Sequence, residues 1–177
     1  MFQFLYRLRL ILPLIFLSGY LHSSGFLRTD GRTIADGDGN PVLLRGFGLG
    51  GWLVQEGYMW NIHGFFGSPS NIESKIIDLV GAENTAAFYQ AYYENYITEA
   101  DVAFIAANGF NALRVPFHYK FFSPAPGEYI QDGFNLVDQL LEWCADYGVY
   151  LILDMHCAPG AQNTNDFSDS DGNVAGL

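Results

Sequence analysis

The chain of 177 residues is long enough for one domain with a substantial core, and half of its residues are apolar while 15% are charged, which excludes a disordered chain. Eight Lys and Arg residues against nineteen Asp and Glu residues give a formal net charge of −11. This sign excludes a surface that neutralises phosphates, so nucleic acid and anionic membranes are poor partners, whereas neutral polymers such as polysaccharides stay open.

The N-terminus has the pattern of an export signal. Two arginines precede an apolar run over residues 10–17, and small residues follow at 23–25. The run is about half of the roughly 20 residues that a membrane-spanning helix needs, so a stable membrane anchor is the weaker interpretation. The sequence predicts a signal peptide over 1–25, a mature chain from Phe26, and a secreted or periplasmic location.

Turn-forming residues dominate the next segment. Asp30-Gly31 predicts a short hairpin, because this pair accepts the positive φ angles of two-residue turns. DGDGNP over 36–41 predicts a second turn in preference to a calcium loop, since the distal glutamate is missing. The run VLLRGFGLGGWL from Val42 begins with the pattern of a buried strand and ends in glycines that indicate a loop.

Two helices are predicted next. Ser70 and Glu73 form a capping box for a helix that Gly81 ends. The segment 82–96 contains strong helix formers. Its aromatic stripe predicts packing in preference to ligand binding, and consists of Phe88, Tyr92 and Tyr96.

The third helix and the strand after it follow from capping and breaking residues. Thr98 and Asp101 repeat the capping pattern, and Asn108-Gly109 ends the helix. FNALRVPF over 110–117 predicts a strand, which we expect Pro116 to end because proline cannot donate to a ladder.

The C-terminal third predicts one more helix and one more strand. Apolar residues at helical spacing indicate an amphipathic helix over 133–147, and Gly148 ends it. VYLILDMH over 149–156 is a nearly continuous apolar run, as in strands that are covered on both faces. Strands that alternate with long helical crossovers predict an α/β fold with a parallel sheet.

The two cysteines, Cys144 and Cys157, are interpreted as buried free thiols in preference to a disulfide. Neither has a second thiol or a histidine pair at metal-ligand spacing, so the sequence predicts no zinc site and no cofactor. Serine-nucleophile chemistry is disfavoured as well, because the sequence lacks a G-x-S-x-G elbow.

Ligands of parallel α/β sheets collect at the C-terminal ends of the strands, where three clusters lie: GGWLVQEGYMW, LRVPFHYKFF and DMHCAPGAQN. The rings of the first cluster suit the faces of sugars, or they pack as a lid, and the sequence leaves both open. These rings are Trp52, Tyr58, Trp60, Phe65 and Phe66.

Charged side chains mark the other two clusters. Arg114 lies in an apolar strand, and a buried guanidinium needs an acceptor, either a structural or a catalytic carboxylate. His156 follows Asp154 by two residues, so both side chains project to the same side, and the strand-end position favours a site role. His118 is weaker evidence of the same kind.

The three clusters, in this order and with helix-sized spacers, resemble the first three barrel strands and loops of glycoside hydrolase family 5. This resemblance implies a (β/α)8 TIM barrel. The chain would hold the N-terminal hairpin and about the first three βα units, so that 26–177 is the incomplete N-terminal part of a catalytic domain.

The resemblance also implies roles for single residues. Arg114 matches the arginine beneath the nucleophile, and His156 matches the histidine at the subsite of the sugar whose bond breaks. Glu56 resembles a glutamate that contacts the sugar, while His118 and Asn163 fall on loop positions that face the cleft. These five residues are the predicted substrate-binding set.

The resemblance finally implies a retaining hydrolase of β-glucan polysaccharide or oligosaccharide, of the endo-β-1,4-glucanase or exo-β-1,3-glucanase kind. Retaining enzymes use two glutamates about 5 to 5.5 Å apart. All seven glutamates here precede His156, so both catalytic residues are expected outside this chain, which we expect to be inactive alone. The alternative is a truncated, non-catalytic carbohydrate-binding remnant.

Overall fold

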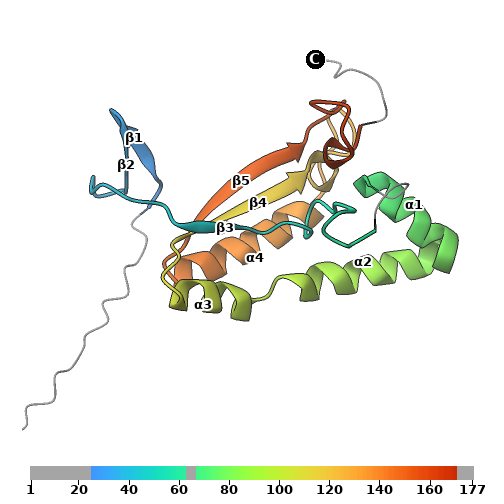
Figure 1. Ribbon diagram of the computed structural model, residues 1–177, viewed down its shortest axis with the longest axis horizontal. Helices are drawn as coiled ribbons and strands as arrows, with labels where there is room; N and C mark the ends of the chain where they lie inside the picture. Colours follow the sequence, from blue (N-terminus) through green and yellow to red (C-terminus); the bar gives the residue numbers. More distant parts are fainter. Residues whose placement is uncertain (1–24, 63–66, 171–177) are drawn as a thin grey trace, which may run out of the picture.

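The computed structural model describes residues 25–62 and 67–170 (Figure 1). Almost all of the predicted signal peptide, together with Phe65 and Phe66, lies outside these residues. The elements in chain order are β1 Arg28–Asp30, β2 Thr33–Ala35, β3 Gly46–Gly48, α1 Pro69–Val80, α2 Ala82–Tyr96, α3 Glu99–Ala107, β4 Ala112–His118, the 3-10 turn η1 Tyr119–Phe121, α4 Asp132–Asp146, β5 Tyr150–Cys157 and the 3-10 turn η2 Asp166–Ser168. Within the described ranges, no helix has the length and apolarity to cross a membrane.

The three longer-range strands form a parallel sheet in the order β3-β4-β5, which confirms the predicted parallel arrangement. Figure 1 shows α3 and α4 on one side of this sheet, while the β1–β2 hairpin stands apart at the end where β3 begins. The loops after β4 and β5 lie together at the opposite end, near α1. The sheet therefore brings the chain segments after its strands to one edge.

Strand β4 extends beyond Pro116, so the prediction that this proline ends the strand was wrong. Pro116 pairs in register with Asp154 of β5, and the strand continues to His118. The Arg114 carbonyl accepts from Leu49 on the β3 side, and alternate residues of a strand bond to the same neighbour. Pro116 therefore lacks its N–H on the side of β4 that faces β3, at a point beyond the end of β3, so no hydrogen bond of the sheet is lost.

The N-terminal strands differ from the prediction in two details. The hairpin loop consists of Gly31 and Arg32, one position later than expected, with Gly31 at φ 59°; this is the first loop position, where type II′ turns require glycine. The predicted buried strand from Val42 was wrong, because only Gly46–Gly48 is a strand and all three residues are exposed. Strand β3 is an edge strand of the described sheet, where it pairs with β4 alone.

The helix ends follow local chemistry with one exception. The capping box of Thr98 and Asp101 is present as predicted, and Gly81 ends α1. The predicted box of Ser70 and Glu73 was wrong, because Ser68 is the N-cap and its Oγ accepts from the N–H of Asn71 at 3.3 Å. Ser68 is followed by proline at the first helical position, a sequence that favours a helix start two residues earlier.

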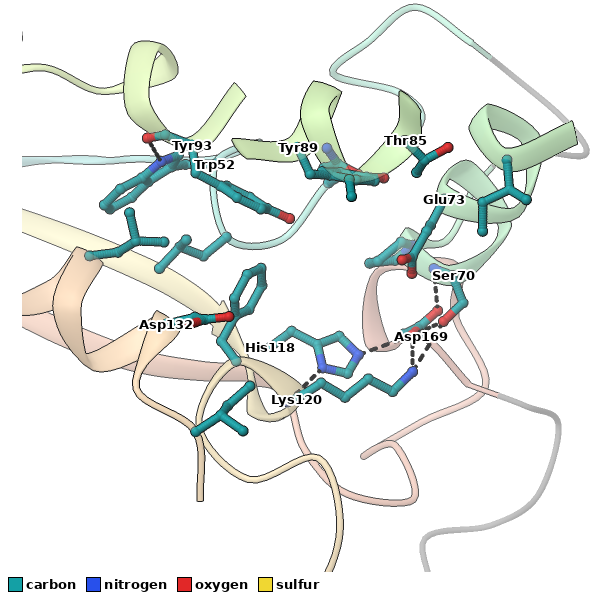
Figure 2. Close-up of a pocket in the computed structure, with 18 of the residues that line it drawn as sticks. Trp52, Ser70, Glu73, Thr85, Tyr89, Tyr93, His118, Lys120, Asp132 and Asp169 are labelled. Atoms are coloured by element: carbon teal, nitrogen blue, oxygen red, sulfur yellow. Dashed lines mark hydrogen bonds and ion pairs between the residues drawn. The ribbon is translucent and has the colours of Figure 1, made fainter. Parts of the chain in front are cut away.

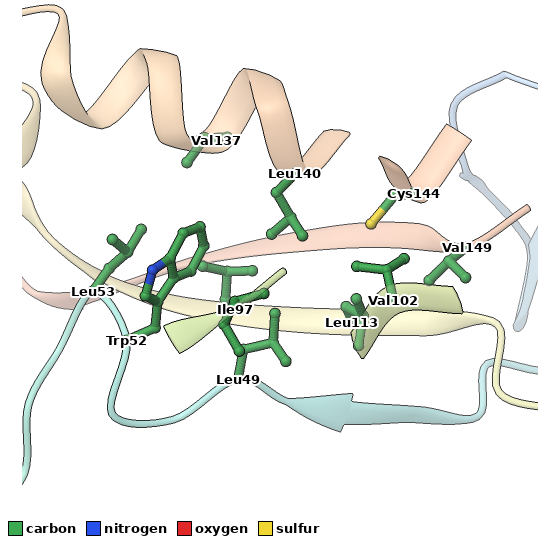
Figure 3. Close-up of a cluster of buried hydrophobic side chains, with 11 residues drawn as sticks. Leu49, Trp52, Leu53, Ile97, Val102, Leu113, Val137, Leu140, Cys144 and Val149 are labelled. Carbon is green, nitrogen blue, oxygen red and sulfur yellow. The ribbon is translucent and has the colours of Figure 1, made fainter. Parts of the chain in front are cut away.

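The core lies between the sheet and helices α3 and α4 (Figure 3). Its centre is fully buried and comprises Val102, Leu113, Val115, Leu140 and Cys144. Each buried side chain of this size stabilises the fold by about 1.5 to 3 kcal/mol relative to exposure. Both cysteines are free and buried, as predicted, so packing holds this core together without a disulfide.

Candidate functional site

Three predicted polar side chains meet on the sheet face opposite α3 and α4. The Arg114 guanidinium donates from Nη2 to the Oδ2 atom of Asp154, and the same nitrogen lies 3.2 Å from Nδ1 of His156. That Nδ1 atom is 2.9 Å from Asp154 Oδ2. Strand alternation and the parallel register put all three side chains on one face, as the sequence predicted for Asp154 and His156.

Among the described residues, Arg114 is not enclosed, in contrast to the buried guanidinium that the sequence suggested. Its side chain is 45% exposed, because it points away from the helices, and its acceptor is Asp154 of the neighbouring strand. The shared carboxylate oxygen fixes both the guanidinium and the imidazole. Among the described residues, the hydrogen bonds of the His156 ring engage only Nδ1, so that Nε2 can bind a ligand.

Glu56 lies in the loop after β3, in a cavity one of whose aromatic rings also contacts His156. Glu56 is 6% exposed, and it lines a cavity of about 340 Å³ together with Tyr58, Asn165 and Phe167. The Phe167 ring also packs against the His156 ring, with 5.9 Å between the ring centres. Phe167 therefore contacts the His156 ring and lines the cavity of Glu56, and its role was not predicted.

The loop that carries Glu56 is held by tyrosines of α2. The Tyr92 hydroxyl donates to the Gly51 carbonyl, and the Tyr96 hydroxyl donates to the Gly50 carbonyl at 3.3 Å. Gly51 has φ 81°, and a Cβ atom there would lie 2.5 Å from the Tyr96 oxygen, so only glycine fits. Of the predicted aromatic stripe, Tyr92 and Tyr96 thus hold this loop, whereas Phe88 is 38% exposed and contacts only rings of its own helix among the described residues.

The rings of the first cluster divide into packed and exposed ones. Trp52 is 2% exposed and donates from Nε1 to the Tyr93 carbonyl at 3.1 Å, while Trp60 packs against Tyr92. Tyr58 is 62% exposed. Of the rings in this cluster that the structure describes, Tyr58 alone is largely exposed and could present an open face to a sugar.

His118 belongs to a separate network, around Asp169 (Figure 2). Its Nδ1 atom accepts from the Lys120 N–H at 3.1 Å, so the ring proton lies on Nε2 and is donated to Asp169 Oδ2 at 3.0 Å. The Ser70 N–H donates to Asp169 Oδ1 at 3.0 Å, and the Ser70 hydroxyl donates to Oδ2 at 2.5 Å. This carboxylate therefore joins the ends of β4 and β5 to the first turn of α1.

Asp169 was missed by the sequence analysis. Its side chain is 4% exposed, and its backbone is left-handed at φ 50°. Burial acts to raise the pKa of Asp169, but the hydrogen bonds from His118, Ser70 and Ser68 together outweigh burial and hold the pKa well below its usual range. No local sequence signal marks this residue, since its partners lie up to 99 positions away.

Asn163 shapes the loop between β5 and η2. Its Oδ1 atom accepts from the N–H of Asn165 and from the hydroxyl of Ser168, both at 2.8 Å. These contacts are local to the loop, and none joins Asn163 to Arg114 or His156. The structure thus brings Arg114 and His156 together, places Glu56 in a cavity that neither of them lines, and gives His118 and Asn163 contacts of their own.

The carboxylates near the strand ends surround Cys157. Burial, and then the charges of Asp169, Glu56 and Asp154, raise the pKa of the Cys157 thiol to about 12. The thiol donates to the Phe167 carbonyl at 3.2 Å. In the described part of the chain, no group of His, Cys, Asp and Glu side chains could hold a metal ion.

The parallel β3-β4-β5 sheet with helical crossovers is an α/β arrangement of the kind from which TIM-type barrels are built, and Arg114, Asp154 and His156 lie on one of its faces. Comparison with known families agrees: the model of the cellulase family, glycosyl hydrolase family 5, matches residues 71–174, which is more than half of the chain. The chain belongs to glycoside hydrolase family 5.

Known relatives carry names of the same class. The chain is 39% identical over 152 residues to a beta-xylosidase of Phanerodontia chrysosporium, covering 85% of this chain and 31% of that protein. It is 34% identical over 146 residues to glucan 1,3-beta-glucosidase 1 of Schizosaccharomyces pombe, covering 76% of this chain and 36% of that protein. The chain spans about a third of the length of these curated relatives.

Solved structures give the same fold. The crystal structure of AoRut matches with a TM-score of 0.61 at 26% identity, over 75% of this chain and 38% of that one. The rutinosidase from Aspergillus niger has the same TM-score at 22% identity, over 74% and 37% of the two chains, and shows likeness of fold alone.

Proposed function

We propose that residues 26–177 are the N-terminal part of the catalytic domain of a retaining glycoside hydrolase that acts on β-glucan. In this proposal the hairpin precedes the barrel, and β3, β4 and β5 are its first three strands. Residues 1–25 are a signal peptide, which makes the protein secreted or periplasmic. Family membership and the relatives named as glucan 1,3-beta-glucosidases support the substrate class.

The observation that carries the proposal is the group of Arg114, Asp154 and His156 on one face of two neighbouring parallel strands. Asp154 orients the imidazole through Nδ1, which directs Nε2 to a sugar hydroxyl. Arg114 supplies fixed positive charge, which favours the ionised form of any carboxylate placed above it. Glu56 accepts hydrogen bonds from the hydroxyl groups of the same sugar.

The chemistry of bond cleavage belongs to two glutamates outside this chain. One donates a proton to the leaving oxygen while the other attacks the anomeric carbon, and water then hydrolyses the glycosyl-enzyme with the first glutamate as base. The residues described above hold the sugar and tune the nucleophile. Two displacements at one carbon retain its configuration.

The test uses the full-length protein encoded by the reading frame that contains this chain. We expect hydrolysis of laminarin, a β-1,3-glucan, and release of products whose first anomer, observed by NMR, has the β configuration of the substrate. Arg114→Ala lowers kcat/KM by about 10- to 100-fold, the equivalent of a lost charge-assisted contact of about 1.5 to 3 kcal/mol.

Arg32→Ala serves as the matched control, because Arg32 lies in the exposed hairpin loop and leaves the rate unchanged. An unchanged kcat/KM for Arg114→Ala sinks the assigned role of this arginine. First-formed α anomers exclude a retaining mechanism.

Cleavage of β-xylosides is a second candidate activity, favoured by the 39% identity to a beta-xylosidase. Parallel assays on aryl β-glucoside and aryl β-xyloside decide between the two by the ratio of their kcat/KM values. The non-catalytic alternative predicts that the protein is retained on insoluble β-glucan and hydrolyses neither substrate.

A further inference from the structure

A second cavity, of about 570 Å³, lies between the α1–α2 pair and the end of β4 (Figure 2). Its volume is in the range of about 300 to 1,000 Å³ that small-molecule sites occupy. Figure 2 shows Tyr89 and Tyr93 of α2 along one wall, with His118, Lys120 and Asp132 on the opposite wall and Glu73 at one end. Arg114, Asp154 and His156 do not line this cavity, and neither does Glu56.

Three polar groups turn toward this cavity without a hydrogen-bond partner among the described residues. The Tyr93 hydroxyl is one of them, although most of its ring is buried against Tyr89 and Phe121. The carboxylates of Glu73 and Asp132 are the other two, and they come from helices on different sides of the cavity. Glu73 and Asp132 are exposed to solvent, but the Nε2 atom of Gln55, a residue that is 4% exposed and lines the same cavity, is buried without a hydrogen-bond partner. Because buried polar groups are normally paired, this atom points to a ligand.

The charges around the cavity restrict the class of that ligand. Lys120 is paired with Asp169, at 3.5 Å, so Glu73 and Asp132 leave the cavity with two uncompensated negative charges. This charge excludes an anion. A metal ion is a poor fit as well, because no cluster of ligating side chains occurs in the described ranges.

A neutral polyhydroxy ligand matches these features. Its hydroxyl groups donate to the two carboxylates and accept from the Tyr93 hydroxyl and from the Lys120 ammonium group. Its C–H faces pack on the tyrosine rings of α2. Burial, followed by the charges of Tyr89 and Glu73, raises the pKa of Tyr93, which keeps its phenol protonated as a donor at neutral pH.

We propose that the cavity between α2 and the β4 end is a second saccharide-binding site, in which Tyr93, Glu73 and Asp132 bind the hydroxyl groups of a gluco-oligosaccharide. It holds a segment of the glycan apart from Arg114, Asp154 and His156, which do not line this cavity. The choice of a glucan as the saccharide rests on the proposed function, whereas the polyhydroxy class rests on the cavity itself.

Two isosteric substitutions test the site in the full-length protein. Tyr93→Phe removes only the hydroxyl, and Glu73→Gln removes only the charge, so the packing of α1 and α2 is kept. Tyr129→Phe and Glu83→Gln are matched controls, because these residues lie outside the cavity lining. Binding is measured by retardation in native gels that contain laminarin, and hydrolysis is measured with an aryl β-glucoside.

We expect laminarin to bind about 2- to 10-fold more weakly to Tyr93→Phe and about tenfold more weakly to Glu73→Gln, with aryl glucoside turnover unchanged in both. Unchanged retardation of both variants overturns the second site. The saccharide assignment is also overturned if the cavity binds the cation tetramethylammonium and does not bind laminarin. If the protein shows Tyr93-dependent retardation but cleaves no glycoside, the second site stands and the hydrolase proposal falls. If the protein cleaves the aryl β-glucoside but shows no Tyr93-dependent retardation, the hydrolase proposal stands and the second site falls.

Discussion

Replacement of Asp169 by asparagine tests whether one carboxylate ties the strand ends to α1. Asparagine has the same shape, but whichever way its amide is turned, one of the two positions that now accept hydrogen bonds becomes a donor. Oδ2 accepts from both His118 and the Ser70 hydroxyl, while Oδ1 accepts from the Ser70 N–H. At least one hydrogen bond to a charged acceptor is therefore lost, and in its place the N–H of the asparagine amide faces another donor.

The magnitude follows from burial and from the kind of contact. Asp169 is 4% exposed on its side chain, so solvent screens these hydrogen bonds little. Hydrogen bonds to charged groups contribute about 1.5 to 3 kcal/mol each, without strict additivity. We expect Asp169→Asn to lower the free energy of unfolding by about 2 to 3 kcal/mol at pH 7, a large part of the about 5 to 15 kcal/mol typical of a domain.

The pH dependence gives the sharper result. The pKa of Asp169 is lower in the folded protein than the ordinary value of about 3.9, so its stabilisation is present above that pH and is lost as the pH falls toward the folded value. Urea unfolding of the wild type and the variant should give a difference that is constant from pH 7 to about pH 5 and shrinks below it.

Asp78→Asn is the matched control, since its pair with Lys75 is exposed on both sides and contributes little. The reasoning about Asp169 is refuted if Asp169→Asn costs no more than this control, or if the difference between wild type and variant does not shrink on acidification.

Two further outcomes can be checked directly. Tyr92→Phe deletes the hydroxyl that bonds the Gly51 carbonyl, and should lower the free energy of unfolding by about 1 kcal/mol in urea titrations, with Tyr129→Phe as the unaffected control. Burial raises the pKa values of the Cys144 and Cys157 thiols to about 12, so neither should react with Ellman's reagent at pH 8 until urea is added; rapid labelling of the native protein would contradict this.

Local patterns were sufficient for the group at the strand ends. The two-residue spacing of Asp154 and His156 fixes their common side on β5, and the parallel order sets Arg114 on the neighbouring strand. The prediction failed on burial: Arg114 looked enclosed because its neighbours in sequence are apolar, yet those neighbours face α3 and α4 while Arg114 faces the other side.

The sequence by itself determined the order of the elements, the parallel sheet, the Thr98–Asp101 box and the free thiols, because each depends on residues a few positions apart or on composition. Only the tertiary structure decided that Ser70 donates hydrogen bonds to Asp169, and that His118 donates to the same carboxylate. These contacts join residues 99 and 51 positions apart, and no local spacing encodes them. The spacing of apolar residues indicates which face of a helix or strand is buried. Only the fold decides which polar groups from distant parts of the sequence come into contact.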